Sequence, residues 1–328
     1  MNNEKLKKGI NEICNFLEYN PGIMDLEKAF EGRNSYQRIF IRKRGGKKKG
    51  KRVIHVPPPK LKNVQSVIHR RVLEMVEWPA SVHGFVKNRS HLTAALKHSR
   101  SIPPPVALLL IDFKDAFSNV GVKKVERALD KRLQPNLLCP LSPGAIKLLA
   151  KLITYRGRLP QGAPSSPTIF NLVALDLDEV LSVYAEERGY TYTRYVDNIA
   201  VSSPKPIPKN ERAEIIGLCR QFGFQVVSEK ARYQEAKWGV LEMTKVLLQP
   251  YGGQKWYASY GLGLSNRKFV DKVRAMVHRA QKDPSISLAS IWGKIDYVRL
   301  VDPYKLSSRL SKPMRQLRSI QSNLERRK

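Results

Sequence analysis

The segment VALLLIDFKDAF, residues 106–117, carries the clearest structural signal in this sequence. Its first six residues are all apolar, which is typical of a short buried strand, and the run ends at Asp112. A carboxylate at the end of a buried strand is costly to desolvate unless it faces solvent or binds a cation such as Mg²⁺, which takes oxygen ligands. An aspartate that caps a following helix explains the pattern about as often. The segment alone therefore leaves a metal ligand and a helix cap as open alternatives.

Two further strands are predicted at residues 190–195 and 199–202, joined by the tight turn Val196-Asp197-Asn198. Asp and Asn are good turn residues, so an ordinary hairpin explains this second segment by itself. The third segment is LPQGAPSSP, residues 159–167, followed by a predicted helix over 168–180. Its Gly, Pro and small residues let the backbone approach a nucleotide or a template strand before a helix N-terminus, although a proline-rich loop is the simpler alternative.

The charge balance favours a polyanionic partner. The chain has 328 residues with 59 Lys and Arg against 28 Asp and Glu, a formal net charge of +31. A hydrophobic fraction of 42% is enough for a sizeable core and excludes a disordered basic tail. Because the excess is spread over the whole chain, nucleic acid is the leading candidate partner.

Other functional classes are disfavoured. Cys14, Cys139 and Cys219 are far apart and show no CxxC or Cys/His pairing, so neither a zinc site nor a disulfide framework is expected. No signal peptide is recognisable, and the longest apolar run is far below the roughly 20 residues that span a bilayer. A cytoplasmic protein without membrane association is expected.

The flanking regions are basic. Surface helices are predicted over residues 1–40, a strand over 52–57 and an amphipathic helix over 61–78. The loop RKRGGKKKGKR, residues 42–52, has eight basic residues and reads as a solvated loop or a phosphate-contacting one. Residues 265–328 carry 16 Lys and Arg against 5 Asp and Glu and are predicted to form helices with one face on a core and another facing phosphate.

In this order, the three segments resemble the reverse transcriptases of bacterial retrons, in which an aspartate-bearing strand, a PQGxxxSP loop and a Y-x-D-D hairpin are sequential polymerase motifs. The resemblance runs from Arg52 to about Leu310 and includes further short motifs: RVIHVPPPKLKNVQ (52–65), HGFVKNRS (83–90), the segment 223–230 and WGKIDYV (292–298). It implies an α+β right-hand polymerase with an antiparallel palm sheet. The implied division is fingers over residues 1–105, palm over 106–245 and a basic helical thumb over 246–328.

The same resemblance implies two-metal chemistry. Two Mg²⁺ ions, or Mn²⁺ as an alternative, would lie roughly 4 Å apart. Asp112 and Asp197 would hold them, with the Phe113 backbone carbonyl and Asn198 as further ligands. Asp112, Asp197 and Asn198 are the predicted catalytic residues.

The resemblance also implies a nucleotide site. Phe117 would lie under the sugar and exclude a ribose 2′-OH, Gln161 and Gly162 would contact the incoming nucleotide, and Arg89 and Lys230 would lie towards its triphosphate. Asp115 is expected to be structural or a neighbour of the phosphates. A surface ion pair for Arg89 and a core ring for Phe117 are the alternatives. The predicted RNA contacts are Arg52, Lys60, Lys268, Lys272 and Arg279.

The sequence departs from the family pattern at three motifs. The Y-x-D-D hairpin is Tyr195-Val196-Asp197-Asn198, so the site loses one of three expected negative charges, and metal affinity and rate should fall without activity being lost. The usual Asn-Ala-x-x-His is AALKH, residues 94–98. The usual Val-Thr-Gly before the thumb is Met243-Thr244-Lys245.

The function implied is RNA-templated DNA synthesis from dNTPs. One structured noncoding RNA of the msr-msd type would serve as template and primer, extension would begin at an internal 2′-OH, and the branched RNA–DNA product (msDNA) would act in phage defence beside an effector or toxin protein. Two other functions are considered: a catalytically weakened polymerase fold that acts as an RNA-binding scaffold, and a template-independent DNA polymerase of an abortive-infection system.

Overall fold

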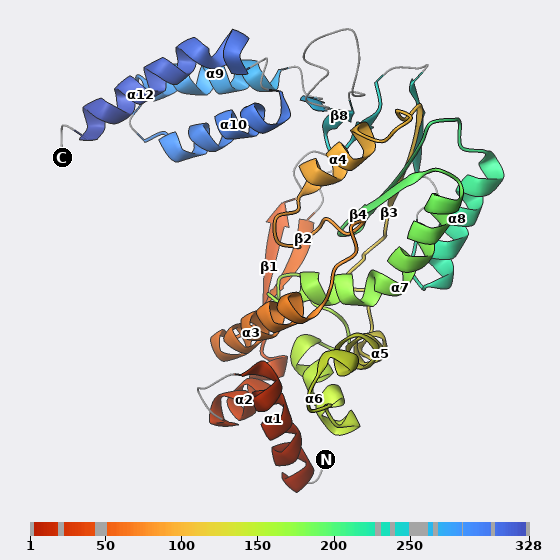
Figure 1. Ribbon diagram of the computed structural model, residues 1–328. Helices are drawn as coiled ribbons and strands as arrows, with labels where there is room; N and C mark the ends of the chain where they lie inside the picture. Colours follow the sequence, from red (N-terminus) through yellow and green to blue (C-terminus); the bar gives the residue numbers. More distant parts are fainter. Residues whose placement is uncertain are drawn as a thin grey trace.

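A computed structural model describes residues 3–18, 23–42, 51–226, 231–236, 240–248, 262–264, 268–283, 285–302 and 306–325. The molecule is elongated, with the N-terminal helices at one end and the C-terminal helices at the other (Figure 1). Among the described residues, no helix combines the length and the apolar character that a bilayer span requires.

The centre of the molecule is an antiparallel four-stranded sheet with the order β4-β5-β3-β6. Its strands are β3 (Ala107–Asp112), β4 (Thr191–Tyr195), β5 (Asn198–Ser203) and β6 (Arg232–Glu235). Successive side chains point to opposite faces of a strand. Leu109 and Ile111 of β3 belong to one hydrophobic core, whereas Leu108 belongs to another. Because both faces of β3 are covered, its residues are continuously apolar rather than alternating.

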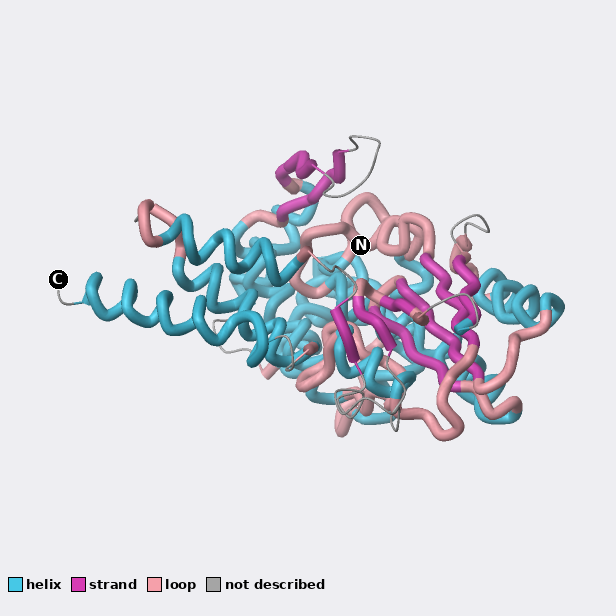
Figure 2. The backbone as a smooth tube through the Cα atoms, turned by 90° about the horizontal axis from the view of Figure 1, so that it is seen from above, coloured by secondary structure: helices cyan, strands magenta, loops and turns pink. Residues whose placement is uncertain are grey.

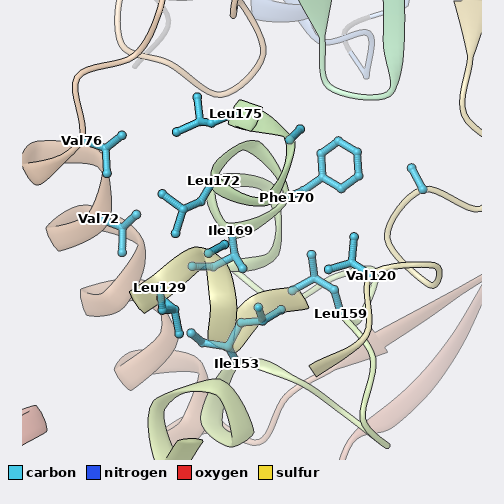
Figure 3. Close-up of a cluster of buried hydrophobic side chains, with 14 of the residues drawn as sticks. Val72, Val76, Val120, Leu129, Ile153, Leu159, Ile169, Phe170, Leu172 and Leu175 are labelled. Carbon is cyan, nitrogen blue, oxygen red and sulfur yellow. The ribbon is translucent and has the colours of Figure 1, made fainter. Parts of the chain in front are cut away.

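The first core lies between the sheet and a layer of helices. The long helix α7 (Ser166–Glu187) contributes Ile169, Phe170, Leu172 and Leu175 to it (Figure 3). The surrounding helices are α1 (Asn3–Leu17), α2 (Ile23–Glu31), α3 (Pro59–Met75), α5 (Val122–Leu133), α6 (Pro143–Ile153) and α8 (Lys209–Gln221), with the 3-10 turns η1 (Gly32–Asn34) and η2 (Gln134–Asn136).

The second core joins the other face of the sheet to the C-terminal helices. Leu108 and Ala200 of the sheet share it with Ala94 and Ala95 of α4 (His91–Ser99). The remaining elements are the strands β7 (Glu242–Met243), β8 (Val246–Leu248) and β9 (Leu262–Leu264), the helices α9 (Phe269–Ala280), α10 (Leu288–Val301) and α12 (Ser311–Glu325), and the π-helical turn η6 (Leu306–Leu310). Helix α4, which lies within the predicted fingers, therefore packs with the C-terminal part of the chain.

A separate hairpin stands beside these two cores. It consists of β1 (Gln37–Arg42) and β2 (Lys51–Val56), paired antiparallel from Gln37 opposite Val56 to Arg42 opposite Lys51. Figure 2, viewed from above, shows it as a two-stranded ribbon distinct from the central sheet. Most of the basic loop over 42–52 lies outside the described residues.

Three sequence expectations need correction. Residues 37–42 form a strand, since Ile39, Phe40 and Ile41 are β-branched and aromatic residues of the kind that favours strands over helices. The helix predicted to end at residue 78 ends at Met75, ahead of Pro79, whose ring disfavours helical backbone in the residue before it. The helix after the LPQGAPSSP loop is longer than predicted and runs to Glu187.

Candidate active site

The ends of β3, β4 and β5 bring the predicted catalytic residues together. Asp112 is the last residue of β3 and stands opposite Asn198 in the β3–β5 register. Asp197 lies in the turn between β4 and β5, and its carbonyl oxygen accepts a 3.0 Å hydrogen bond from the Phe113 N–H. Asp112 does not cap a helix, since the next helix begins only at Val122.

A cleft of about 370 Å³ opens beside the two aspartates. Seven of the residues singled out from the sequence line it: Arg52, Asp112, Phe113, Asp115, Phe117, Gln161 and Asp197. Its other lining residues are Lys51, Val53, His55, Ala116 and Ser118. A second cleft of about 310 Å³ shares Asp112 and is lined by Asn198, Tyr195, Arg232 and Thr244, among others. The two aspartates and the asparagine therefore lie where two clefts meet.

The electrostatics of this cleft suit a divalent cation. Burial raises the pKa of Asp197, and the negative charge of Asp112 raises it further, while Arg52 and Arg194 act in the opposite direction. Two carboxylates that repel each other and a nearby amide oxygen form the kind of hard donor set that Mg²⁺ or Mn²⁺ prefers. In the described part of the chain, no group of three or more His, Cys, Asp and Glu side chains forms a metal cluster. Asparagine at position 198 fits that result, because it supplies a neutral donor.

One wall of the cleft is built by β2 and the loop before α7. The His55 N–H donates a 2.7 Å hydrogen bond to the Gln161 carbonyl. Gly162 has φ +117°, and a Cβ there would lie 2.4 Å from Ile54 Cγ2. Only glycine fits this close approach without moving the strand. The Phe117 ring packs 5.2 Å from that of Phe170, centroid to centroid, so one side of Phe117 is part of the core.

Behind the turn lies a fully buried ionic network. Arg194 of β4 binds Asp178 of α7 in a bidentate manner, with hydrogen bonds of 2.8 Å from Nε and 2.6 Å from Nη2. Its Nη1 donates to the Asn171 side chain at 2.8 Å and to the Val196 carbonyl at 2.9 Å. The Asn171 amide in turn donates to the Gly84 carbonyl at 2.6 Å. The network therefore connects α7 and the loop around Gly84 to the residue that precedes Asp197.

The comparison with known proteins assigns the family. The sequence model of the family described as Reverse transcriptase (RNA-dependent DNA polymerase) matches residues 41–244. This chain belongs to the reverse transcriptase family. Family membership, together with the antiparallel sheet and its helices, confirms the predicted α+β right-hand polymerase fold. Reverse transcriptases generally use divalent metal ions, in agreement with the donor set at Asp112 and Asp197.

Relatives among curated proteins include several retron reverse transcriptases, which confirms the predicted resemblance. The chain is 30% identical over 292 residues to the retron Mx162 enzyme of Myxococcus xanthus, covering 81% of this chain and 57% of that protein. It is 27% identical over 267 residues to the retron Ec86 enzyme of Escherichia coli, covering 81% and 76%. The chain spans 57% and 62% of the length of two Myxococcus relatives. A telomerase from Candida albicans, solved with telomeric RNA, is similar at 11% identity and a TM-score of 0.45 over 85% of this chain and 56% of that one.

The two altered retron motifs have structural counterparts. His98 is buried between the Ser202 and Thr193 hydroxyls, 2.7 and 2.8 Å away, and burial lowers its pKa to about 3. It is therefore neutral at physiological pH, and its two hydrogen bonds connect α4 to β4 and β5 of this reverse transcriptase. Lys245 has φ +66° in the tight turn between β7 and β8, a left-handed conformation for which the family's usual glycine is better suited.

Other predicted site residues lie elsewhere. The Arg89 guanidinium donates to the carbonyls of Val82 at 2.8 Å and Trp78 at 3.0 Å, and also to that of Pro79. These hydrogen bonds stabilise the loop over residues 78–89. The predicted role of Arg89 in binding a triphosphate stays a prediction. Lys230 lies outside the described residues. Lys60 is exposed, 4.0 Å from Asp25.

The predicted RNA-binding residues of the C-terminal helices share an exposed surface. Lys268, Lys272 and Arg279 are exposed, whereas Val270, Val273, Val277 and Ala280 of α9 are buried. A wider groove of about 780 Å³ between α9 and α12 was not predicted. It is lined by Arg274, His278, Arg309 and Lys312, with Asp271 paired to Arg309 at 2.6 Å.

Sequence reasoning also missed the buried network of Arg194, Asp178 and Asn171. Two signals could have found it. Arg194 interrupts an otherwise half-apolar strand, and Asn171 and Asp178 are two turns apart on a mostly apolar helix, where they share one face. A buried Arg and a buried Asp each require a partner of opposite charge, so the two residues are expected to pair with each other.

Replacement of Asp178 tests how much this network contributes to the free energy of unfolding. Asp178→Asn leaves the Arg194 charge buried without its partner, so the free energy of unfolding should fall by roughly 3–5 kcal/mol. Asp176→Asn, at a half-exposed position of the same helix where the carboxylate pairs with Lys131 at 2.9 Å and with Arg132, should cost less, about 1 kcal/mol. Urea unfolding followed by circular dichroism measures both. Equal losses of unfolding free energy in the two variants would show that the buried pair stabilises the fold no more than the Asp176 pair does.

Proposed function

We propose that this chain is an RNA-directed DNA polymerase. The observation that carries the proposal is the meeting of Asp112 and Asp197 in one cleft at the end of an antiparallel sheet, in a chain of the reverse transcriptase family. Two carboxylates with a nearby amide suit metal-assisted transfer of a nucleotide to a primer hydroxyl. The net charge of +31 suits a polyanionic template and product.

The proposed cofactors are two Mg²⁺ ions, with Mn²⁺ as an alternative. Asp112 and Asp197 would hold them through their carboxylates, with the Phe113 carbonyl and the Asn198 amide as further oxygen donors. Bound there, the ions would lower the pKa of the primer hydroxyl and neutralise the phosphates of the nucleotide.

The incoming dNTP is proposed to occupy the cleft beside these aspartates. Phe117 and Gln161 line this cleft, which supports their assignment to the sugar and the nucleotide. Arg52 was predicted to contact RNA. Its position among the cleft residues, where its charge lowers the pKa of Asp197, favours a role towards the phosphates of the nucleotide.

The proposed division into fingers, palm and thumb follows the sequence boundaries at residues 105 and 245. The thumb would grip a structured RNA through the exposed cations of α9 and the groove between α9 and α12. An A-form stem offers phosphates and 2′-hydroxyls to such a surface. Lys60 would add a contact from the fingers.

The similarity to retron enzymes supports a finer proposal about the product. The template and primer would be one msr-msd RNA, extension would begin at an internal 2′-OH, and the branched msDNA would act in phage defence beside an effector protein in the bacterial cytoplasm. The relatives Mx162 and Ec86 are themselves described as retron reverse transcriptases.

Asn198 favours a second candidate function. Because the site has an amide where a third carboxylate is expected, a weakened polymerase fold that serves as an RNA-binding scaffold would show the same cleft. Primer extension on primed RNA with dNTPs distinguishes the two. RNA that co-purifies and binds without any incorporation in Mg²⁺ or Mn²⁺ would favour the scaffold, and incorporation that survives template removal would favour a template-independent polymerase.

Neutralising one of the paired aspartates should abolish incorporation. Asp112→Asn removes a carboxylate from the proposed metal site, and a loss of several kcal/mol of charge stabilisation lowers the rate by at least about 100-fold. Primer extension measures the rate, with Asp130→Asn on α5, outside both clefts, as the control. RNA affinity should stay within about twofold. Full activity in Asp112→Asn would refute the proposed site.

Restoring the third carboxylate should preserve or raise incorporation. Asn198→Asp adds a charged oxygen ligand beside Asp112 and Asp197, so the Mg²⁺ concentration needed for half-maximal rate should fall. Primer extension over a Mg²⁺ titration measures both quantities. A drop in rate at saturating Mg²⁺ would show that the asparagine has a role of its own.

A further inference from the structure

The β1–β2 ribbon has two faces of different chemistry. Strand alternation and the β1–β2 register place Phe40 opposite Val53 on one face. The residues on that face are Arg38, Phe40, Arg42, Lys51, Val53 and His55, and none of them is acidic. The opposite face carries Ile39 and Ile41. We call the first one the Phe40 face.

Phe40 is an aromatic ring left in solvent between two cations. It is 58% exposed, and all six residues of β1 are exposed. The Arg38 guanidinium lies 5.7 Å from the ring centroid and the Lys51 ammonium 5.9 Å from it. Those distances are within the range of cation–π attraction. Both cations are therefore close enough to attract the ring, which still keeps more than half of its surface exposed.

The Phe40 face borders the candidate active site. Lys51, Val53 and His55 of this face line the cleft that contains Asp112 and Asp197, and Arg52 lines it from the opposite face. Phe40 lies directly across from Val53, one strand further out. Figure 1 shows the ribbon standing beside the central sheet. A nucleic-acid strand that enters the cleft along this face would pass Phe40 and then Val53, which lines the cleft.

We propose that Phe40 is a stacking platform for an unpaired nucleobase of the template strand on its way into the cleft. An exposed aromatic ring with cations beside it is the arrangement with which proteins bind single-stranded nucleic acid, because bases stack on the ring and phosphates pair with the cations. The absence of acidic residues from this face disfavours a basic protein partner. The inference rests on the proposed polymerase function, because it places the template in this cleft.

A binding experiment without catalysis tests the platform. The probe is a primer–template duplex whose single-stranded template overhang carries 2-aminopurine at the first, second or third unpaired position, one per probe. Full-length protein is titrated in the absence of dNTPs, and both 2-aminopurine fluorescence and duplex anisotropy are recorded. A blunt-ended duplex of the same sequence is the reference.

Stacking on Phe40 predicts a specific pattern. Wild-type protein should quench 2-aminopurine at one of the three positions. Phe40→Ala should lose that quenching and bind the overhang probe about tenfold more weakly, with unchanged affinity for the blunt duplex. Phe40→Trp should restore both properties. Ile41→Ala, 51% exposed on the opposite face of the same strand, should behave as wild type.

Other results would overturn the platform. If Phe40→Ala binds both duplexes as tightly as wild type, Phe40 does not contact the template and the proposal is refuted. Equal weakening for overhang and blunt duplexes indicates a contact with paired nucleic acid, and a raised KM for dNTP with unchanged overhang binding indicates the base of the incoming nucleotide instead. Because quenching requires no incorporation, an inactive wild type that still quenches would refute polymerase activity and leave the platform standing.

Discussion

The buried bond between Arg194 and Asp178 fixes the position on which the candidate chemistry depends. Removing both charges from water is costly, and well-packed apolar residues could fill the same space with comparable stability. An apolar pair could not bind a carboxylate, an amide and a backbone carbonyl at once. A planar guanidinium does so, and one of its partners is the carbonyl of Val196, which directly precedes Asp197. The ion pair is therefore best understood as a device that fixes geometry, acting through the backbone of the turn.

That geometry includes strain. Val196 has φ +59°, a left-handed conformation that is unfavourable for a β-branched residue and persists only where its surroundings enforce it. Two contacts enforce it here. Arg194 holds the carbonyl of Val196, and Gly84 lies so close that a Cβ would be 2.6 Å from the Val196 nitrogen. Asn171 bonds to both Arg194 and Gly84, so the two contacts form one unit.

Local patterns predicted the strands and the candidate site better than they predicted its support. The apolar run before Asp112 and the turn at Asp197 can be recognised separately, and the order of the motifs implies that they meet. The Arg194 network could not be predicted from local patterns. The spacing of Asn171 and Asp178 shows that they share one face of a helix, but it does not show which strand packs against that face. The β1 strand was missed for a related reason: both of its faces are exposed, so no one-sided burial marks its period. Lys230 lies outside the described residues, and its role stays a prediction.

The charges around the cleft link metal and nucleotide binding. Asp112, Asp115 and Asp197 against Lys51 and Arg52 give a formal charge of −1, since burial and the nearby Arg38 and Arg156 lower the pKa of His55 and favour its neutral form. One divalent cation would change that charge to +1 and a second to +3, a state that is unfavourable without an anion. A nucleotide triphosphate carries several negative charges and would restore the balance. Asn198 lines the neighbouring cleft, which shares Asp112, and its neutral amide adds no charge to this balance, whereas an aspartate there would add one negative charge. A site with two carboxylates therefore depends more strongly on the bound nucleotide to retain its second ion than a site with three would.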